Sequence, residues 1–255
     1  MPRPYLLALF LLSLVFLPSC TPVGPRSSEA TQLLGSHWNA IESSIVAQRQ
    51  AGYPDYDPTW LYVVDPATQR MHVISRKNGQ IKETLRCGTG KRGLGFGDAQ
   101  TPTGFFTMGG VRIAKNGDYT IQTGDSKKGV SGIYAEILYP PTYPDPSLRG
   151  YVPNGVVIHS YNPAASSMLH QRRAQGLIGR VPCTTGCPVP DIDEAPKLVP
   201  YLKKSAGRFD PTAVPNAHLQ SLINRGLVKQ YETNQLGAAI YILPRSYQRN
   251  RLKII

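Results

Sequence analysis

Short apolar runs separated by turn residues dominate the first half of this chain. Residues 60–64, 71–75 and 81–87 are rich in β-branched and aromatic side chains, with Asp65-Pro66 and Asn78-Gly79 between them. Asn-Gly between two such runs is a strong signal for a tight β-hairpin. Three strands joined in this way form an antiparallel meander, so the fold must be built around a sheet.

Further short runs continue the β pattern along the chain. We predict strands at 101–107, 133–139, 155–160 and 238–243, and helices at 29–49, 195–204 and 217–231. Ser27 or Ser28 is the expected N-cap of the first helix. The 24 glycines and 23 prolines predict many turns and long loops. Together these patterns predict a mainly β protein with peripheral helices.

The start of the chain is typical of a targeting segment. Arg3 supplies a positive charge, and the apolar stretch at 5–17 is too short to span a bilayer but suits a signal peptide. The small residue Ser19 before Cys20 resembles a bacterial lipoprotein signal, which implies cleavage and lipidation at Cys20. The alternative is an ordinary secretory signal in which this cysteine has no role. Thr21 is not the aspartate that retains lipoproteins in the inner membrane, so we expect a periplasmic protein anchored to the outer membrane.

The chain is strongly basic, with 28 Lys and Arg against 16 Asp and Glu and a net charge of +12. In the cytoplasm this charge would suggest a nucleic-acid partner. An exported protein meets anionic lipid, lipopolysaccharide or cell-wall polymer instead. The basic residues are scattered and are not interleaved with aromatic side chains, so we expect a solvated surface and no nucleic-acid binding.

Four cysteines have to be accounted for. If Cys20 is lipidated, Cys87, Cys183 and Cys187 remain, an odd number for an oxidising compartment. One of them is therefore free or only transiently paired. Cys183 has two candidate partners, Cys187 and Cys87, and the sequence does not choose between them.

The pairing of His159 with Cys187 is the strongest chemical signal. His159 ends an apolar run, and Cys187 follows a Thr-x-Gly turn. A thiol becomes a strong nucleophile as the thiolate, which a neighbouring imidazole promotes. We therefore predict Cys187 as nucleophile and His159 as base. Ser160, or a backbone carbonyl nearby, is the expected acceptor that fixes the tautomer of the imidazole.

The turn at Cys187 also supplies candidate oxyanion donors. Pro188 has no N–H, so the local donors are the backbone N–H groups of Gly186 and Cys187. The Cys183–Cys187 spacing is a poor zinc signature, and the glycine-rich residues 88–97 lack the pattern of a phosphate-binding loop. We expect no metal and no cofactor.

Four segments together resemble the L,D-transpeptidase catalytic domain (YkuD-type), in its murein branch with a Gly-Cys-Pro motif. They are residues 61–75, the Thr-Pro-Thr-Gly-Phe of 101–105, the Val-Ile-His-Ser of 157–160, and 179–190, which contains Thr-Thr-Gly-Cys-Pro. The resemblance covers roughly 59–205. Taken with the patterns above, the predicted domain organisation is a signal peptide at 1–19, a tether at 20–28, a helix and linker at 29–58, the catalytic domain at 59–205, and a helix and strand at 206–255 whose membership of that domain stays open.

The resemblance implies a β-sandwich or bent barrel with a cysteine nucleophile. It implies attack on the bond before the terminal D-Ala of a peptidoglycan stem peptide, followed by transfer to an amine (transpeptidation) or to water (carboxypeptidation). By matching position, Cys187 is the nucleophile, His159 the base and Ser160 the orienting residue, with oxyanion donors at Gly186 and Cys187.

This chain departs from the family pattern close to the nucleophile. Cys183-Thr184 stands where the branch usually has Arg-Ser, and Thr185 stands where some members carry a second histidine. These departures leave the acceptor amine open, and the oligomeric state is equally open. Two other classes remain: a non-catalytic peptidoglycan-binding lipoprotein with a Cys183–Cys187 disulfide, and a metal-binding module.

Overall fold

The computed structural model describes residues 28–90, 101–115, 132–160, 171, 174–178, 184, 186–210 and 217–244. Several predicted features lie outside these residues. They are the signal segment at 1–19, the tether up to residue 27 with Cys20, residues 91–97 of the glycine-rich segment, Cys183, and the basic tail from residue 245.

Two helices open the described chain, where we predicted one helix over 29–49. α1 (Ser28–Leu34) and α2 (His37–Gln50) are separated at Gly35, whose φ of +49° ends the first helix. The apolar residues that suggested a helix are buried in both: Ala30, Leu34, Trp38, Ile41 and Ile45. The predicted helical face is therefore correct, and the continuous helix is wrong.

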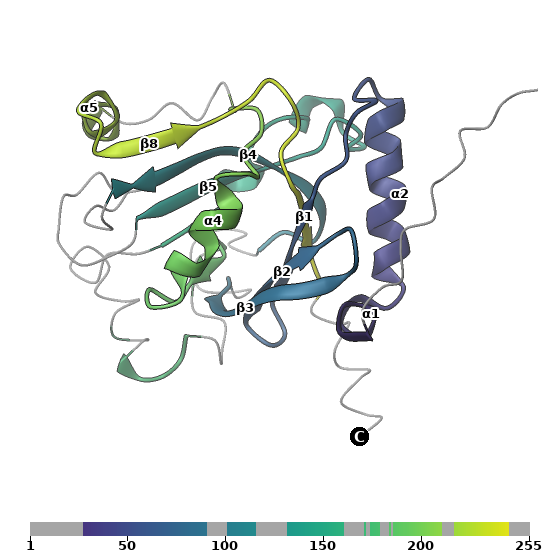
Figure 1. Cartoon of the computed structure of the whole chain (residues 1–255), viewed down its shortest axis with the longest axis horizontal. Coiled ribbons are helices and arrows are strands. Elements are labelled where there is room, and N and C mark those ends of the chain that lie inside the picture. The colour runs from purple at the N-terminus through teal and green to yellow at the C-terminus, as the bar shows by residue number, and fades with distance from the viewer. Residues whose placement is uncertain are drawn as a thin grey trace, which may run out of the picture.

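The predicted meander is confirmed. β1 (Trp60–Asp65), β2 (Arg70–Ser75) and β3 (Gln80–Gly88) pair antiparallel in sequence order. β1 is buried almost throughout because both of its faces are covered. Tyr62 and Val64 face one hydrophobic core, whereas Leu61 and Val63 face a second core shared with α1 and α2. Figure 1 shows α2 lying along this side of the sheet.

The remaining strands extend the sheet from both sides of the meander. β4 (Gly104–Ala114) pairs with β5 (Ile133–Leu138), which pairs with the short β6 (Val157–His159), and β7 (Val189–Pro190) pairs with β3. Single 3-10 turns, Pro146–Leu148 and Pro153–Gly155, lie between β5 and β6.

The C-terminal part of the described chain belongs to the same sheet. We predicted one helix over 217–231, which is wrong: α5 (Ala217–Asn224) ends before Gly226, at φ +67°, and β8 (Val228–Tyr231) then pairs with β4. β9 (Ala239–Ile242) lies between β4 and β1, antiparallel to the first and parallel to the second. Residues beyond 206 therefore contribute a central strand.

The helix predicted over 195–204 is shorter than expected. A 3-10 turn (Ala195–Leu198) leads into the four-residue α4 (Val199–Leu202). Pro196 and Pro200 lack the N–H groups that a regular α-helix needs, which explains the irregular geometry. Leu198 and Leu202 still pack on the main core.

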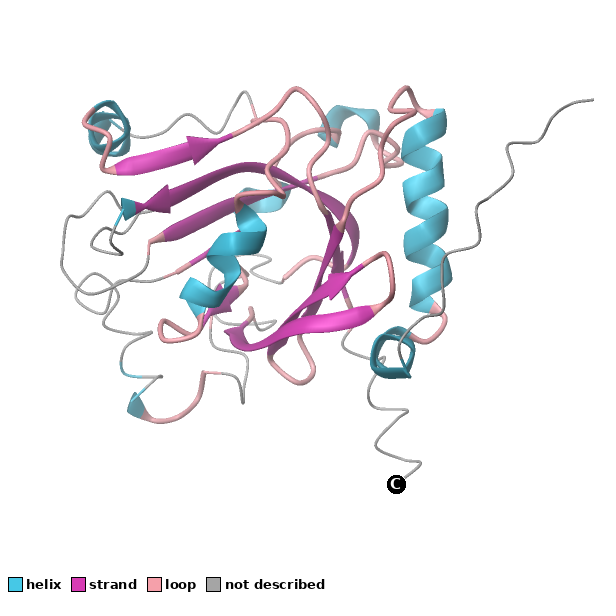
Figure 2. Ribbon diagram, viewed as in Figure 1, coloured by secondary structure: helices cyan, strands magenta, loops and turns pink. Residues whose placement is uncertain are grey.

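The strand order is β6-β5-β4-β9-β1-β2-β3-β7, with β8 also on β4. The ends of this order meet, because the His159 N–H donates to the Pro188 carbonyl at 3.3 Å. The sheet is thus a nearly closed, bent barrel, with α1 and α2 on its outside and α4 within the bend (Figure 2), and the predicted mainly β fold is confirmed. Within the described residues, no helix has the length and apolar character needed to cross a membrane.

Candidate active site

His159 lies at the end of β6 with its imidazole buried. Its Nδ1 atom is 2.7 Å from the carbonyl oxygen of Ser160. A carbonyl oxygen only accepts hydrogen bonds, so Nδ1 carries the proton and Nε2 is the ring nitrogen able to take one up. The ring is therefore held in the tautomer that a general base requires.

Ser160 provides this acceptor through its backbone rather than its side chain. The Ser160 hydroxyl accepts the N–H of Ile133 at 3.0 Å, and the Ser160 N–H donates to the Ile133 carbonyl at 3.1 Å. In a regular antiparallel pair the Ser160 carbonyl would accept the Ile133 N–H. Because the hydroxyl takes that place, the carbonyl is left for the imidazole.

Cys187 lies in a turn closed by Thr184. The Thr184 hydroxyl donates to the Cys187 carbonyl at 2.7 Å and accepts the Gly186 N–H at 3.3 Å. Gly186 has a φ of +129°, in a region that side-chain-bearing residues rarely occupy. Two oxyanion donors were predicted. The Gly186 N–H already binds the Thr184 hydroxyl within the turn, whereas the Cys187 N–H has no acceptor in the described part of the chain.

The turn is fastened to the sheet by a second threonine. Thr101, from the Thr-Pro-Thr-Gly segment, donates its hydroxyl to the Gly186 carbonyl at 2.6 Å and accepts the Gly90 N–H at 2.9 Å. Thr184 also donates its N–H to the Thr89 carbonyl at 3.0 Å. This gives the Thr101 segment a physical role, since its buried hydroxyl joins the cysteine turn to the end of β3.

Gln69 supports this arrangement from the turn between β1 and β2. Its buried amide donates to the Thr89 hydroxyl at 2.6 Å and accepts the Thr89 N–H at 2.9 Å. Gln69 is the one described residue other than glycine with a positive φ, at 55°. A strained backbone held by side-chain hydrogen bonds next to a candidate site is a common feature of functional loops.

The cysteine and histidine segments lie against each other. The His159 N–H donates to the carbonyl of Pro188, the residue directly after Cys187. The Cys187 thiol is free and half-buried, with Sγ 3.8 Å from the Gly155 carbonyl at the entry to β6. The fold therefore brings the predicted nucleophile and the predicted base to neighbouring segments.

Burial disfavours the charged forms of both groups. It raises the pKa of the Cys187 thiol, which the backbone of Val157 partly offsets, and it lowers the pKa of His159, which the Ser160 carbonyl partly offsets. Both shifts favour a neutral thiol and a neutral imidazole. A thiolate–imidazolium pair at this site needs additional stabilisation.

The other cysteines are placed differently. Cys87 is buried at the end of β3 among core side chains, with its Sγ 3.6 Å from the Gly88 carbonyl. Cys20 and Cys183 lie outside the described residues, so both proposed pairings of Cys183 stay predictions. No group of three potential metal ligands occurs within the residues that the structure describes.

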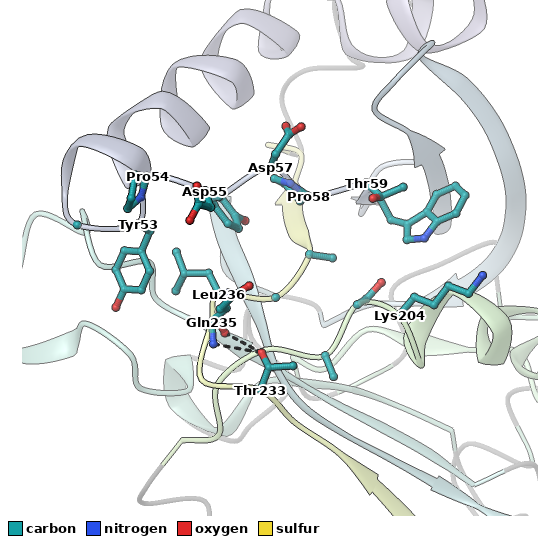
Figure 3. Close-up of a pocket in the computed structure, with 17 residues that line it drawn as sticks. Tyr53, Pro54, Asp55, Asp57, Pro58, Thr59, Lys204, Thr233, Gln235 and Leu236 are labelled. Atoms are coloured by element: carbon teal, nitrogen blue, oxygen red, sulfur yellow. Dashed lines mark hydrogen bonds between the residues drawn. The ribbon is translucent and has the colours of Figure 1, made fainter. Parts of the chain in front are cut away.

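A cavity of about 420 Å³ lies away from this site. Figure 3 shows it between the linker of Tyr53, Asp55 and Thr59 on one side and Thr233 and Gln235 on the other. Trp60 at the beginning of β1 lines the cavity, whereas the Gln69 amide follows the far end of β1. The cavity and the Cys187 turn are therefore at opposite ends of one strand.

Residues 59–206 match the family model of the L,D-transpeptidase catalytic domain, YkuD. The chain belongs to this family. The matched region contains the Cys187 turn, His159 and the Thr101 segment, and it stops before β8 and β9. The family assignment therefore rests on the part of the chain that carries the candidate site.

Solved structures of two bacterial proteins are similar to this family member at low identity. An L,D-transpeptidase from Mycobacterium smegmatis is 14% identical with a TM-score of 0.36, over 73% of this chain and 59% of that one. The helical cell shape determining protein Pgp2 from Campylobacter jejuni is 14% identical with a TM-score of 0.38, over 80% and 55%. The chain spans less than two thirds of the length of either structure, and no curated protein sequence matches it.

Sequence reasoning missed the hydroxyls and amide that hold the turn, and it missed Tyr134 on β5. A signal for Tyr134 was present, because Ile133, Ala135 and Ile137 alternate with Tyr134 and Glu136. Such alternation places the two polar residues on the face of the strand opposite the apolar core. The strand is therefore predictable from this pattern, and the same pattern places Tyr134 on its polar face.

Proposed function

We propose that this protein is a cysteine-dependent L,D-transpeptidase that acts on peptidoglycan stem peptides. The observation that carries the proposal is the hydrogen bond from the His159 N–H to the Pro188 carbonyl. This bond holds β6, which carries the imidazole, next to the turn that carries the free Cys187 thiol. The family to which the chain belongs supports the same chemistry.

In the acylation step, Nε2 of His159 accepts the thiol proton and Sγ of Cys187 attacks the carbonyl carbon before the terminal D-Ala. A C–S bond forms and the carbonyl oxygen becomes an oxyanion, for which the Cys187 N–H is the available donor. Collapse of this intermediate breaks the C–N bond. The imidazolium protonates the leaving D-Ala amine, which leaves a thioester on Cys187.

The thioester is then consumed by an acceptor. An amine nitrogen attacks its carbonyl, His159 takes the amine proton, and the Cys187 thiolate leaves and is reprotonated. Water in place of the amine turns the same steps into L,D-carboxypeptidation. A non-catalytic lipoprotein with a Cys183–Cys187 disulfide is the competing hypothesis, and thiol titration of the native protein separates the two, because the disulfide leaves no reactive thiol at Cys187.

Product analysis tests the proposal and separates these outcomes. The full-length protein is incubated with disaccharide tetrapeptide, and the products are identified by mass spectrometry. Cross-linked dimer indicates transfer, tripeptide alone indicates hydrolysis, and neither product rejects the proposal. Cys187→Ala should abolish turnover, while Cys183→Ala, four residues earlier in the sequence, should retain it.

We also propose that the protein is exported and anchored through lipidated Cys20 to the outer membrane. The apolar segment at 5–17, followed closely by Ser19 and Cys20, supports the proposal. Cys20→Ser should move the protein from the membrane fraction to the soluble fraction. If both forms fractionate identically, the anchor is not at Cys20.

A further inference from the structure

A row of polar side chains crosses four strands and ends at His159. Gln230 on β8 is paired with Arg112 on β4, Arg112 with Tyr134 on β5, and Tyr134 with His159 on β6. Residues directly opposite one another in antiparallel strands point to the same face of the sheet. This face is the one opposite the main core, because Val111, Ile113, Ile133 and Ile158 belong to that core. Figure 1 shows β8, β4 and β5 side by side.

Tyr134 and His159 form a close pair across their strands. Ser160 and Ile133, the next pair along, exchange the hydrogen bonds of the ladder. The pair of Tyr134 and His159 is therefore of the non-hydrogen-bonded type, in which facing side chains approach most closely. The charge of Cys187 also contributes to raising the pKa of Tyr134. The phenol is thus paired across the strands with the proposed base, whose N–H binds the residue directly after Cys187.

Arg112 holds Tyr134 from the other side. Its guanidinium is fully buried, with its carbon 5.0 Å from the centre of the Tyr134 ring and 4.5 Å from that of Phe209. Its Nε donates to the Gln230 amide oxygen at 3.0 Å. A cation that contacts two aromatic faces is firmly positioned.

The buried charge of Arg112 is only partly balanced. Its Nη1 lies 3.6 Å from the Glu136 carboxylate, which also accepts the N–H groups of Gly110 and Asp210. Nη2 of Arg112 and Oε1 of Glu136 have no hydrogen-bond partner within the described residues. Burial raises the pKa of Glu136 to about 7, so its negative charge is itself costly. A positive potential therefore persists behind the Tyr134 ring.

We propose that Tyr134, backed by Arg112, is the positioning residue that stabilises the charged form of the Cys187–His159 pair. The proposal rests on the proposed function and answers the problem that burial creates at the site, where both groups favour their neutral forms. When the thiol loses its proton, and with it the contact to the Gly155 carbonyl, the Tyr134 hydroxyl donates a hydrogen bond toward the thiolate, while the guanidinium polarises the phenol. No covalent bond changes, and the phenol keeps its proton.

The environment of the phenol suits a donor. Burial raises the pKa of Tyr134 to about 12, the charges of Glu136 and Cys187 act in the same direction, and Arg112 opposes them. The phenol is therefore protonated throughout the neutral range. The charged and titratable groups around it are Arg112 on β4, Glu136 on β5, His159 on β6, Cys187 before β7, and Asp210, whose N–H binds Glu136.

The test measures formation of the thiolate without any substrate, so its failure is separate from failure of the proposed function. Full-length protein is alkylated with iodoacetamide over a range of pH, and the rate at Cys187 is followed by peptide-resolved mass spectrometry. Tyr134→Phe should raise the pH midpoint of alkylation by about one pH unit, a roughly tenfold loss of thiolate at neutral pH. Glu136→Gln should lower the midpoint, because it removes the negative charge that opposes Arg112.

Tyr62→Phe is the matched control. Tyr62 is a strand tyrosine too, fully buried where Tyr134 is partly buried, and its hydroxyl is 2.9 Å from that of Ser205, but it faces the main core. Its alkylation profile should match that of the wild type. The proposal is overturned if Tyr134→Phe leaves the alkylation midpoint unchanged, or if Tyr134→Phe and Glu136→Gln shift it in the same direction. A non-specific loss of packing around the site would shift the midpoint of both variants in the same direction.

Discussion

The hydrogen bond between Nδ1 of His159 and the Ser160 carbonyl depends on the Ser160 hydroxyl. The carbonyl is 2.7 Å from Nδ1, while the hydroxyl accepts the Ile133 N–H in its place. Ser160 therefore accepts the strand hydrogen bond with its side chain and the imidazole hydrogen bond with its backbone carbonyl. Alanine retains the carbonyl, but then Ile133 and His159 compete for it.

Ser160→Ala should consequently weaken catalysis without abolishing it. We expect kcat to fall about tenfold, or about 1.4 kcal/mol of transition-state stabilisation. The loss of one buried hydrogen bond should lower the free energy of unfolding by about 1–2 kcal/mol. Ser205→Ala is the control, because Ser205 is equally buried and bonds Tyr62 and Tyr201 away from the site. Equal activity loss in both variants would mean that only stability matters.

Thr101→Val should disconnect the cysteine turn from β3. The valine side chain cannot donate to Gly186 or accept from Gly90, so two buried hydrogen bonds are lost. We expect the free energy of unfolding in urea to fall by about 2 kcal/mol and kcat/KM to fall at least tenfold. Thr103→Val in the same segment is exposed and should leave both quantities unchanged. An active Thr101→Val enzyme would show that the turn holds without this anchor.

The meander was predictable because its signals are local. Alternating apolar runs and Asn78-Gly79 specify strands and a hairpin within a few residues. The partner of β9 was not predictable in this way, since its parallel pairing with β1 joins segments at opposite ends of the chain. β8 was mistaken for helix because four residues after Gly226 are too few to show a period of two.

The candidate site was predictable in its residue types but not in its supports. Cys187 and His159 stand out because their chemistry is rare and their local motifs are specific. The hydrogen bonds that hold them come from Gln69, Thr89 and Thr101, which are distant in sequence and chemically ordinary. The use of the Ser160 carbonyl is a matter of strand register, and no single-sequence pattern reports register directly.

Gly186→Ala should strain the backbone at the nucleophile. At a φ of +129° a Cβ atom is unfavourable, and we expect a cost of about 1–3 kcal/mol and loss of most of the activity. Gly52→Ala is the matched control, since Gly52 has a φ of +103° and open space around a Cβ, yet lines the remote cavity. It should be destabilised similarly in thermal melting but keep its activity. Full activity in Gly186→Ala would show that the turn tolerates rearrangement.

Glu136 should make the protein less stable as the pH rises toward neutrality. Burial raises the pKa of Glu136 in the folded state from 4.5 to about 7. Between these values the unfolded chain has released the proton while the folded chain still holds it, so the free energy of unfolding falls as pH increases. The stability contributed by the protonated form is complete below about pH 4.5 and lost above about pH 7. The full loss is on the order of 3 kcal/mol.

Glu136→Gln isolates this contribution from that of other carboxyl groups. Glutamine stays neutral and keeps an oxygen that accepts the Gly110 N–H. Urea unfolding of both proteins at pH 5 and pH 8 should therefore give similar free energies at pH 5 and a more stable variant at pH 8. If the wild type is instead the more stable protein at pH 8, the attraction between the Glu136 carboxylate and Arg112 outweighs the cost of burying that carboxylate. The positive charge of Arg112 behind Tyr134 would then be fully neutralised.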